Sequence, residues 1–356
     1  MNGTTRKLLI GAALPDNCLE VGKSAPHIEA MRELGHGAAL VTLPWATIEY
    51  QAGQFDSNAL TRCRSVLEAL QTAGMEPVCV LSDGTIPRWF ESQGGWASSK
   101  AAEQFTAYAV QVADILAPFC QWWVPISEPE YGLTRTYHEK GLTGYRNAST
   151  QMVCAHRDSS AALRSARSDA NVGLSVRVFS AEPADIDSPW DLRAARRLEH
   201  RLSHRMADRL RDLCGREAFD FALASWGGVV TAGFSPGQWI REWVTTLDEQ
   251  GTRISLRSAH RNAARFDEAM SALLGYQTPL LVLGESEQPS TLHSQVSIVA
   301  RRCAEEGGER VAGFLFRGHV DREEWQRNIP LLQIKCAEPE PKPEPKPEPP
   351  ESPFEL

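Results

Sequence analysis

Strand-like and helix-like segments alternate along most of the chain, and this alternation limits the possible folds more than any other feature. Eight short runs are mainly apolar and lack the regular polar alternation of a half-exposed strand. They are Leu8–Leu14, Ala38–Trp45, Pro77–Leu81, Trp122–Ile126, Val172–Phe179, Phe219–Ala224, Leu280–Leu283 and Val311–Phe316. Amphipathic helical segments separate them, including Ala59–Ala73, Ala101–Leu116, Met152–Ala166 and Arg193–Leu213. This order predicts an α/β protein with a parallel sheet.

Eight strand–helix units favour a closed (β/α)₈ TIM barrel. An open, doubly wound sheet is the alternative, but no Gly-x-Gly-x-x-Gly motif follows the first strand. We expect one barrel domain over residues 1–335. Residues 336–356 form a separate tail, in which proline stands at nearly every second position and prevents helix and sheet formation. The tail is either an inert spacer or an arm that tethers the barrel to a protein partner.

Composition narrows the classes of function. The 42% hydrophobic and 23% charged fractions are typical of a soluble globular protein. No basic cluster is interleaved with aromatic residues, which argues against a nucleic-acid partner. No apolar run approaches the ~18 residues of a membrane span. The eight cysteines are dispersed and contain no Cys-x-x-Cys pair, which favours buried thiols, a cytoplasmic location and no metal site. No cofactor motif is present.

Two carboxylates stand where strands of this barrel would end. Glu128 follows the apolar run Trp122–Ile126 and precedes Pro129, and Glu285 follows the run that starts at Pro279. A carboxylate at the end of a buried strand is costly unless it is paired or used in a reaction. A retaining glycosidase needs two such groups, one as acid/base and one as nucleophile. Glu130 and Glu287 are the respective alternatives.

These residues resemble glycoside hydrolase family 1, the β-glucosidase-like retaining enzymes, over most of residues 25–327. The resemblance rests on the segment 27–35 before Trp45, on Gly74-Met-Glu-Pro77, on Gly94-Gly-Trp96 and on Glu128-Pro129. Glu128-Pro129 is similar to the family's Asn-Glu-Pro motif, which implies that Glu128 is the acid/base. Glu285 falls close to the family's nucleophile, after a one-residue shift from Gly284. Glu324-Trp325 is similar to the family's sugar-contacting Glu-Trp pair.

Several positions depart from the family and imply a divergent member. Ser127 replaces the asparagine before the acid/base, and Asp83 stands near the place of the family's histidine. The arginine of the second strand is an apolar residue here, near Leu40, and Arg317 aligns with a tryptophan after the last strand. Ser225 and Trp226 fall near the family's asparagine and tyrosine. Most of these are positions that would hold a neutral hexose, so we expect a specificity different from that of plain β-glucosidases.

Eight residues are candidates for substrate binding, and Asp83, Arg317 and His319 among them lie just past strand ends. The eight are Asp83, Ser127, Trp45, Trp226, Arg317, His319, Glu324 and Trp325. Asp83 and Arg317 could instead form an ion pair across the barrel mouth. The tryptophans could be stacking platforms for sugar rings or ordinary packing residues. The predicted function is a retaining β-glycosidase. The alternative is a catalytically inactive barrel that binds a carbohydrate or a protein.

Overall fold

The computed structural model describes residues 8–137, 141–233, 259–285, 289–304, 310–317 and 326–328. Eight parallel strands close into a barrel, in the order β1-β10-β9-β8-β7-β6-β5-β2. The predicted TIM barrel is therefore confirmed. The strands are β1 (Leu9–Ala13), β2 (Ala38–Thr42), β5 (Glu76–Ser82), β6 (Trp122–Ile126), β7 (Asn171–Pro183), β8 (Phe221–Ala232), β9 (Leu280–Glu285) and β10 (Val311–Arg317).

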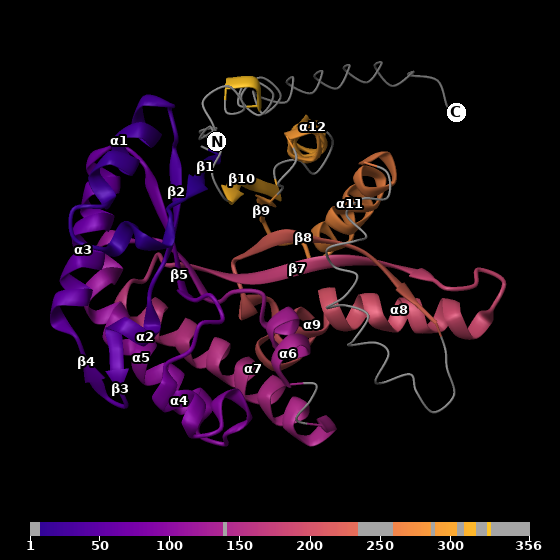
Figure 1. The fold of residues 1–356 in the computed structure, drawn as a ribbon, viewed down its shortest axis with the longest axis horizontal. Helices are drawn as coiled ribbons and strands as arrows, with labels where there is room; N and C mark the ends of the chain where they lie inside the picture. Colours follow the sequence, from indigo (N-terminus) through magenta and orange to yellow (C-terminus); the bar gives the residue numbers. More distant parts are fainter. Residues whose placement is uncertain are drawn as a thin grey trace, which may run out of the picture.

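Helices surround the barrel (Figure 1). The main ones are α1 (Ser24–Glu33), α3 (Ser57–Thr72), α5 (Ala101–Leu116), α7 (Gly141–Ala166), α9 (Arg205–Cys214), α11 (Ala259–Leu274) and α12 (Pro289–Ala304). Shorter elements in the loops are α2 (Trp45–Ile48), α4 (Arg88–Ser92) and the antiparallel pair β3 (Glu49–Gln51) and β4 (Gln54–Phe55). The apolar faces of the helices pack on the outside of the strands and form the largest hydrophobic cluster.

The barrel interior is a second, smaller cluster of aliphatic side chains closed by Phe221. Its ring lies against Trp122, with 5.0 Å between the ring centroids. Gly173 on the neighbouring strand makes room for Phe221, because a Cβ at that position would lie 2.3 Å from the ring. Large side chains therefore fill the lower barrel, and the open end lies where the strands finish.

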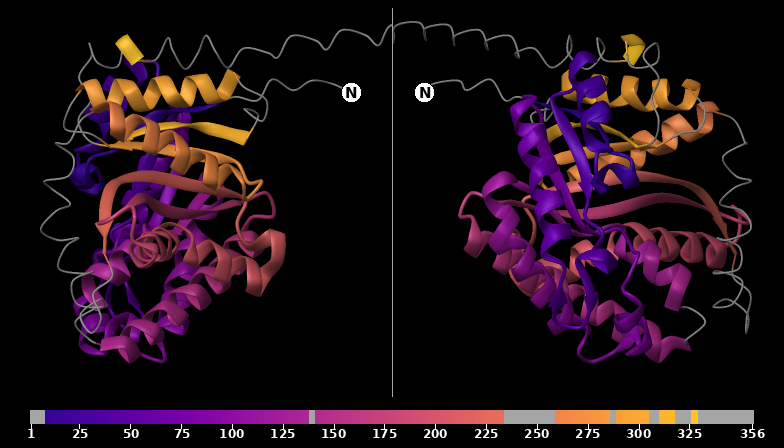
Figure 2. Two further views of the ribbon diagram at one scale, coloured as in Figure 1. Left: turned by 90° about the vertical axis from the view of Figure 1, so that its right-hand side faces the viewer. Right: turned by 60° about the vertical axis from the view of Figure 1, so that its left-hand side comes forward.

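Strands β7 and β8 continue past the barrel as a two-stranded extension. They stay paired as far as Pro183 and Ala232, well beyond the predicted ends at Phe179 and Ala224. Helix α8 (Pro189–Ser203) packs on this extension (Figures 1 and 2). The prediction of a single helix over Arg193–Leu213 is wrong in one respect. Helix α8 ends before His204, and a second helix, α9, begins at Arg205.

Four thiols, those of Cys18, Cys63, Cys79 and Cys120, are buried and free, as the dispersed spacing predicted. Cys154, Cys214 and Cys303 are free and partly exposed. No helix among the described residues is long and apolar enough to cross a membrane.

The tail should be dispensable for folding. Its only large apolar residues are Phe354 and Leu356, so it cannot bury enough surface to offset its ordering entropy. A chain that ends at Lys335 should melt at the same temperature as the full chain, within about 1 °C, in a calorimetric scan. A fall of several degrees would show that the tail packs on the barrel.

Candidate active site

The candidate site lies at the C-terminal mouth of the barrel, where neighbouring strands deliver polar side chains. Glu128 follows β6, Arg177 comes from β7, Ser225 from β8, and Arg317 ends β10. Within the barrel these strands are mainly apolar. Polar residues therefore gather at the one end of the barrel that hydrophobic side chains do not fill.

Glu128 has an unusual backbone conformation. Its φ is +44°, in the left-handed region that residues with a Cβ rarely adopt. The turn from β6 into α6 (Pro129–Tyr137) imposes this conformation, because the carbonyl of Glu128 accepts the first helical hydrogen bond, from the backbone N–H of Gly132. The Glu128 N–H donates to Ser175 Oγ at 3.1 Å, and the Ser127 N–H donates to the Ser82 carbonyl at 2.7 Å. Strain of this kind is concentrated at functional sites.

Glu128 is buried, with 8% of the residue exposed. Both oxygens of its carboxylate have partners. Oε1 accepts a hydrogen bond from Ser225 Oγ at 2.6 Å and pairs with Arg317 Nη1 at 3.3 Å. Oε2 pairs with Arg177 Nη1 at 3.2 Å. Three strands thus converge on one carboxylate and fix its position in the mouth.

Sequence reasoning missed Arg177 as a partner of Glu128. A charge between Val176 and Val178, in an otherwise apolar strand, was the available signal. Its guanidinium carbon lies 4.6 Å from the centroid of the Tyr131 ring, on α6. This cation–π contact helps to orient the arginine toward Glu128.

The backbone places Glu285 at the same mouth. In the register of β9 and β10, the Cα of Glu285 pairs with the Cα of Arg317. Arg317 in turn contacts Glu128, so the same arginine adjoins the backbone of Glu285 and the carboxylate of Glu128. The side chain of Glu285 lies outside the described residues, as do Glu287, His319, Glu324 and Trp325.

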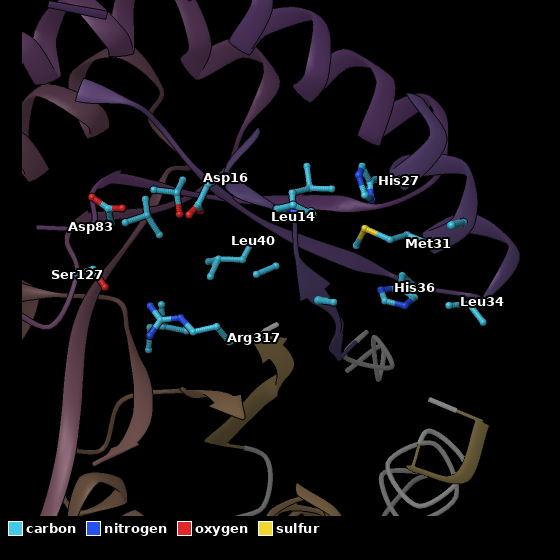
Figure 3. A pocket seen from close by; sticks show the side chains of 17 residues that line it. Leu14, Asp16, His27, Met31, Leu34, His36, Leu40, Asp83, Ser127 and Arg317 are labelled. Atoms are coloured by element: carbon cyan, nitrogen blue, oxygen red, sulfur yellow. The ribbon is translucent and has the colours of Figure 1, made fainter. Parts of the chain in front are cut away.

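Asp83, Ser127 and Arg317 line one cavity of about 900 Å³, which is shown in Figure 3. Asp83 is exposed after β5, and its Oδ1 accepts a hydrogen bond from the Thr85 N–H at 2.8 Å. The contact of Arg317 with Glu128 takes the place of the alternative Asp83–Arg317 pair. Asp83 thus keeps a carboxylate facing the cavity (Figure 3).

Trp45 and Trp226, two candidates for stacking on a sugar ring, lie outside the cavity. Trp45 is 1% exposed and packs among aromatic rings, with Tyr108 at 5.3 Å and Phe90 at 4.8 Å between centroids. Its indole N–H donates to the buried Glu49 carboxylate at 2.9 Å. Trp226 packs on Phe266 of α11, outside the barrel. Neither lines this cavity, and the contacts described for both tryptophans are packing contacts.

Glu130, the alternative to Glu128, points away from the mouth. It is 4% exposed, and Tyr145 on α7 donates its hydroxyl to Oε2 at 3.0 Å. Burial raises the pKa of Glu130, and Arg205 and the Tyr145 hydrogen bond oppose that shift. This environment is structural. Among the described residues, no group of three His, Cys, Asp or Glu is placed to hold a metal ion.

Known structures share the whole barrel. The beta-glycosidase from Pyrococcus horikoshii superposes with a TM-score of 0.72 at 15% identity, over 91% of this chain and 88% of that one. The family 1 b-glucosidase from Thermotoga maritima gives a TM-score of 0.68 at 13% identity, over 88% of this chain and 89% of its own. At these identities the likeness shows the fold alone.

Sequence relatives match over about half of the chain. The lactase-like protein of Mus musculus is 24% identical over 211 residues, which are 55% of this chain and 37% of the mouse protein. The cytosolic beta-glucosidase of Homo sapiens is 24% identical over 184 residues, which are 48% of this chain and 39% of the human protein. The matched part thus spans about two fifths of the length of these curated relatives.

The family profile described as "Glycosyl hydrolase family 1" matches residues 22–211, which is just over half of the chain. That range contains the β6–α6 turn that presents Glu128, together with Arg177. With the barrel and this match established, the chain belongs to glycosyl hydrolase family 1.

Proposed function

We propose that the protein is a retaining β-glycosidase in which Glu128 is the acid/base and Glu285 is the nucleophile. The observation that carries the proposal is the position of Glu128. It is held in a strained conformation at the mouth, and side chains from β7, β8 and β10 contact its carboxylate. The backbone position of Glu285, in register with Arg317, supplies the second carboxylate.

The reaction proceeds in two steps. Glu285 attacks the anomeric carbon while Glu128 gives its proton to the departing glycosidic oxygen, which leaves as the alcohol. A water molecule then attacks the glycosyl-enzyme ester. Glu128 takes the proton of that water, and Glu285 is released as a carboxylate. Ser225 and Ser175 hold Glu128 in place from its side chain and from its backbone N–H.

The ion pairs of Arg177 and Arg317 with Glu128 must be broken, at least in part, for this mechanism to operate. A general acid must present a protonated oxygen to the leaving group, and both oxygens of Glu128 already have partners. Substrate must therefore displace Arg177 or Arg317 from the carboxylate. If it does not, the barrel is a catalytically inactive carbohydrate-binding module. That second candidate function is favoured by this same ion-pair network.

A panel of chromogenic β-glycosides separates the two functions. It should contain neutral hexosides, a glucuronide and a 6-phosphoglycoside. Release of the chromophore from at least one of them, lost in Glu128→Gln for substrates with poor leaving groups, supports the enzyme. Binding without release, measured by calorimetry on the corresponding methyl glycosides, supports the inactive barrel. No release and no binding would contradict both.

The good substrates should carry an anionic group. Arginine pairs a carboxylate or phosphate through two parallel hydrogen bonds, and Arg317 faces the cavity at the position where the family has tryptophan. Arg317→Ala should weaken the best ligand by about 2 kcal/mol, or about 30-fold. Arg310→Ala, at the opposite end of β10, is the matched control and should not change affinity. Unchanged turnover of neutral glucosides in Arg317→Ala would restore plain β-glucosidase specificity.

Carbohydrate metabolism in the cytoplasm fits the free thiols and the name of the human relative, cytosolic beta-glucosidase. The tail would then act as a spacer or as a tether to a protein partner. Pull-down with the isolated tail peptide, compared with a scrambled peptide, tests the tether.

A further inference from the structure

The cavity at the mouth is larger than one sugar ring requires. Its volume of about 900 Å³ lies near the upper end of the range that holds drug-sized ligands. Its polar end is formed by Asp83, Ser127 and Arg317, and Arg317 adjoins Glu128 at 3.3 Å. From there the cavity continues past the end of β1 to the inner face of α1 (Figure 3). We call this continuation the α1 arm.

The α1 arm is lined mainly by hydrocarbon. Leu14 follows β1, Met31 lies on α1, and Leu34 caps the C-terminal end of α1. The alanines at positions 12, 13 and 30 also line the cavity, and their small side chains leave it open. Residues 27, 30, 31 and 34 share one face of α1, because helical neighbours lie three and four positions apart. Leu40, Val80 and Leu223 form an apolar floor inside the barrel.

The polar groups of the α1 arm do not form a second sugar site. Asp16 and His27 are exposed. His36 is 8% exposed, and burial lowers its pKa to about 4, so its ring is uncharged at neutral pH. A second sugar in the arm would bury hydroxyl groups against leucine, methionine and alanine side chains, which is unfavourable.

We propose that the α1 arm binds the aglycone, and that the aglycone is an extended hydrocarbon, as in the β-glycoside of a long-chain alcohol. The inference rests on the proposed glycosidase function, which places the sugar beside Glu128 and Arg317. The glycosidic oxygen then lies at the polar end of the cavity. The chain of the alcohol follows the apolar walls past β1, where its burial is favourable.

A series of n-alkyl β-glycosides tests this site. The sugar is the one released fastest from the chromogenic panel, and the chains are methyl, butyl, hexyl and octyl, below their micelle concentrations. In the full-length protein, kcat/KM should rise by up to about fourfold for each added methylene. Equal kcat/KM across the series, with chromogenic glycosides still hydrolysed, would overturn the aglycone site and leave the glycosidase proposal intact.

Two alanines of α1 provide a matched pair of variants. Both are exposed, but Ala30 lines the cavity and Ala25 does not. Ala30→Trp should remove the gain with chain length and keep turnover of the methyl glycoside. Ala25→Trp should keep both. If Ala30→Trp kept the full gain in kcat/KM with chain length, the proposal would be overturned. If Ala30→Trp fails to fold, Leu34→Trp serves as the test variant instead.

Calorimetry decides the case in which no glycoside is hydrolysed. Octyl β-glucoside should then bind wild type and Ala25→Trp more tightly than methyl β-glucoside, with a negative heat-capacity change. Ala30→Trp should not make this distinction. Equal binding of the octyl and methyl glucosides by wild type would overturn the α1 arm as a hydrocarbon site, whatever becomes of the catalytic proposal.

Discussion

Replacing Glu285 with glutamine is expected to lower the turnover of every glycoside by at least about a thousandfold, because the amide cannot form the glycosyl ester. The residue ends β9, where its Cα pairs with the Cα of Arg317 on β10. Single-turnover assays with activated aryl glycosides measure the loss. Glu128→Gln should behave differently, slowing poor leaving groups most, since only those depend on protonation.

Glu287→Gln is the matched control for the nucleophile. It lies two residues beyond Glu285 and should keep turnover near that of wild type. The reverse result, with wild-type turnover in Glu285→Gln and loss in Glu287→Gln, would move the nucleophile to Glu287. Loss in neither variant would contradict the two-carboxylate mechanism.

Acid should destabilise the fold through His156. This side chain on α7 is 1% exposed, and burial lowers its pKa to about 4 from the usual 6.5. The unfolded chain therefore takes up a proton at a higher pH than the folded protein does. The contribution of His156 to the free energy of unfolding is fully present above pH 6.5. It falls by about 3 kcal/mol as the pH drops toward 4.

Urea unfolding between pH 7 and pH 4 measures this effect. In His156→Phe a ring of similar shape has no proton to gain. The free energy of unfolding of this variant should therefore fall by about 3 kcal/mol less than that of wild type over the same pH range. The readout is the change with pH, which a general loss of stability in the variant does not mimic. Identical pH dependence in wild type and variant would contradict the role of His156.

The barrel could be predicted because its strands are buried on both faces, so most of them are nearly continuous apolar runs. The break at His204 could not, because the buried stripe of Leu198, Leu202, Met206 and Leu210 keeps its helical spacing across it. The extensions of β7 and β8 were also missed. Helix α8, which lies between them in the sequence, packs on this extension, and the pattern of the two strands does not reveal that contact.

The site was predictable in part for a similar reason. Glu128 could be found because a carboxylate and Pro129 end an apolar strand abruptly. Arg177 was overlooked because the strand pattern around it dominated, although a lone charge there needed a partner. For Trp45 the sequence left sugar stacking and packing open, because the rings that bury it, Phe90 and Tyr108, come from distant parts of the chain.

The distance between the carboxyl groups of Glu128 and Glu285, measured in a crystal structure with a bound substrate analogue, tests the central claim most directly. A retaining glycosidase holds the two groups about 5–5.5 Å apart, so that one attacks the sugar while the other protonates the leaving oxygen. We predict that separation at the barrel mouth, with Arg177 or Arg317 moved away from Glu128. A separation beyond ~10 Å, or a Glu285 side chain directed at the outer helices, would contradict both the pair and the mechanism.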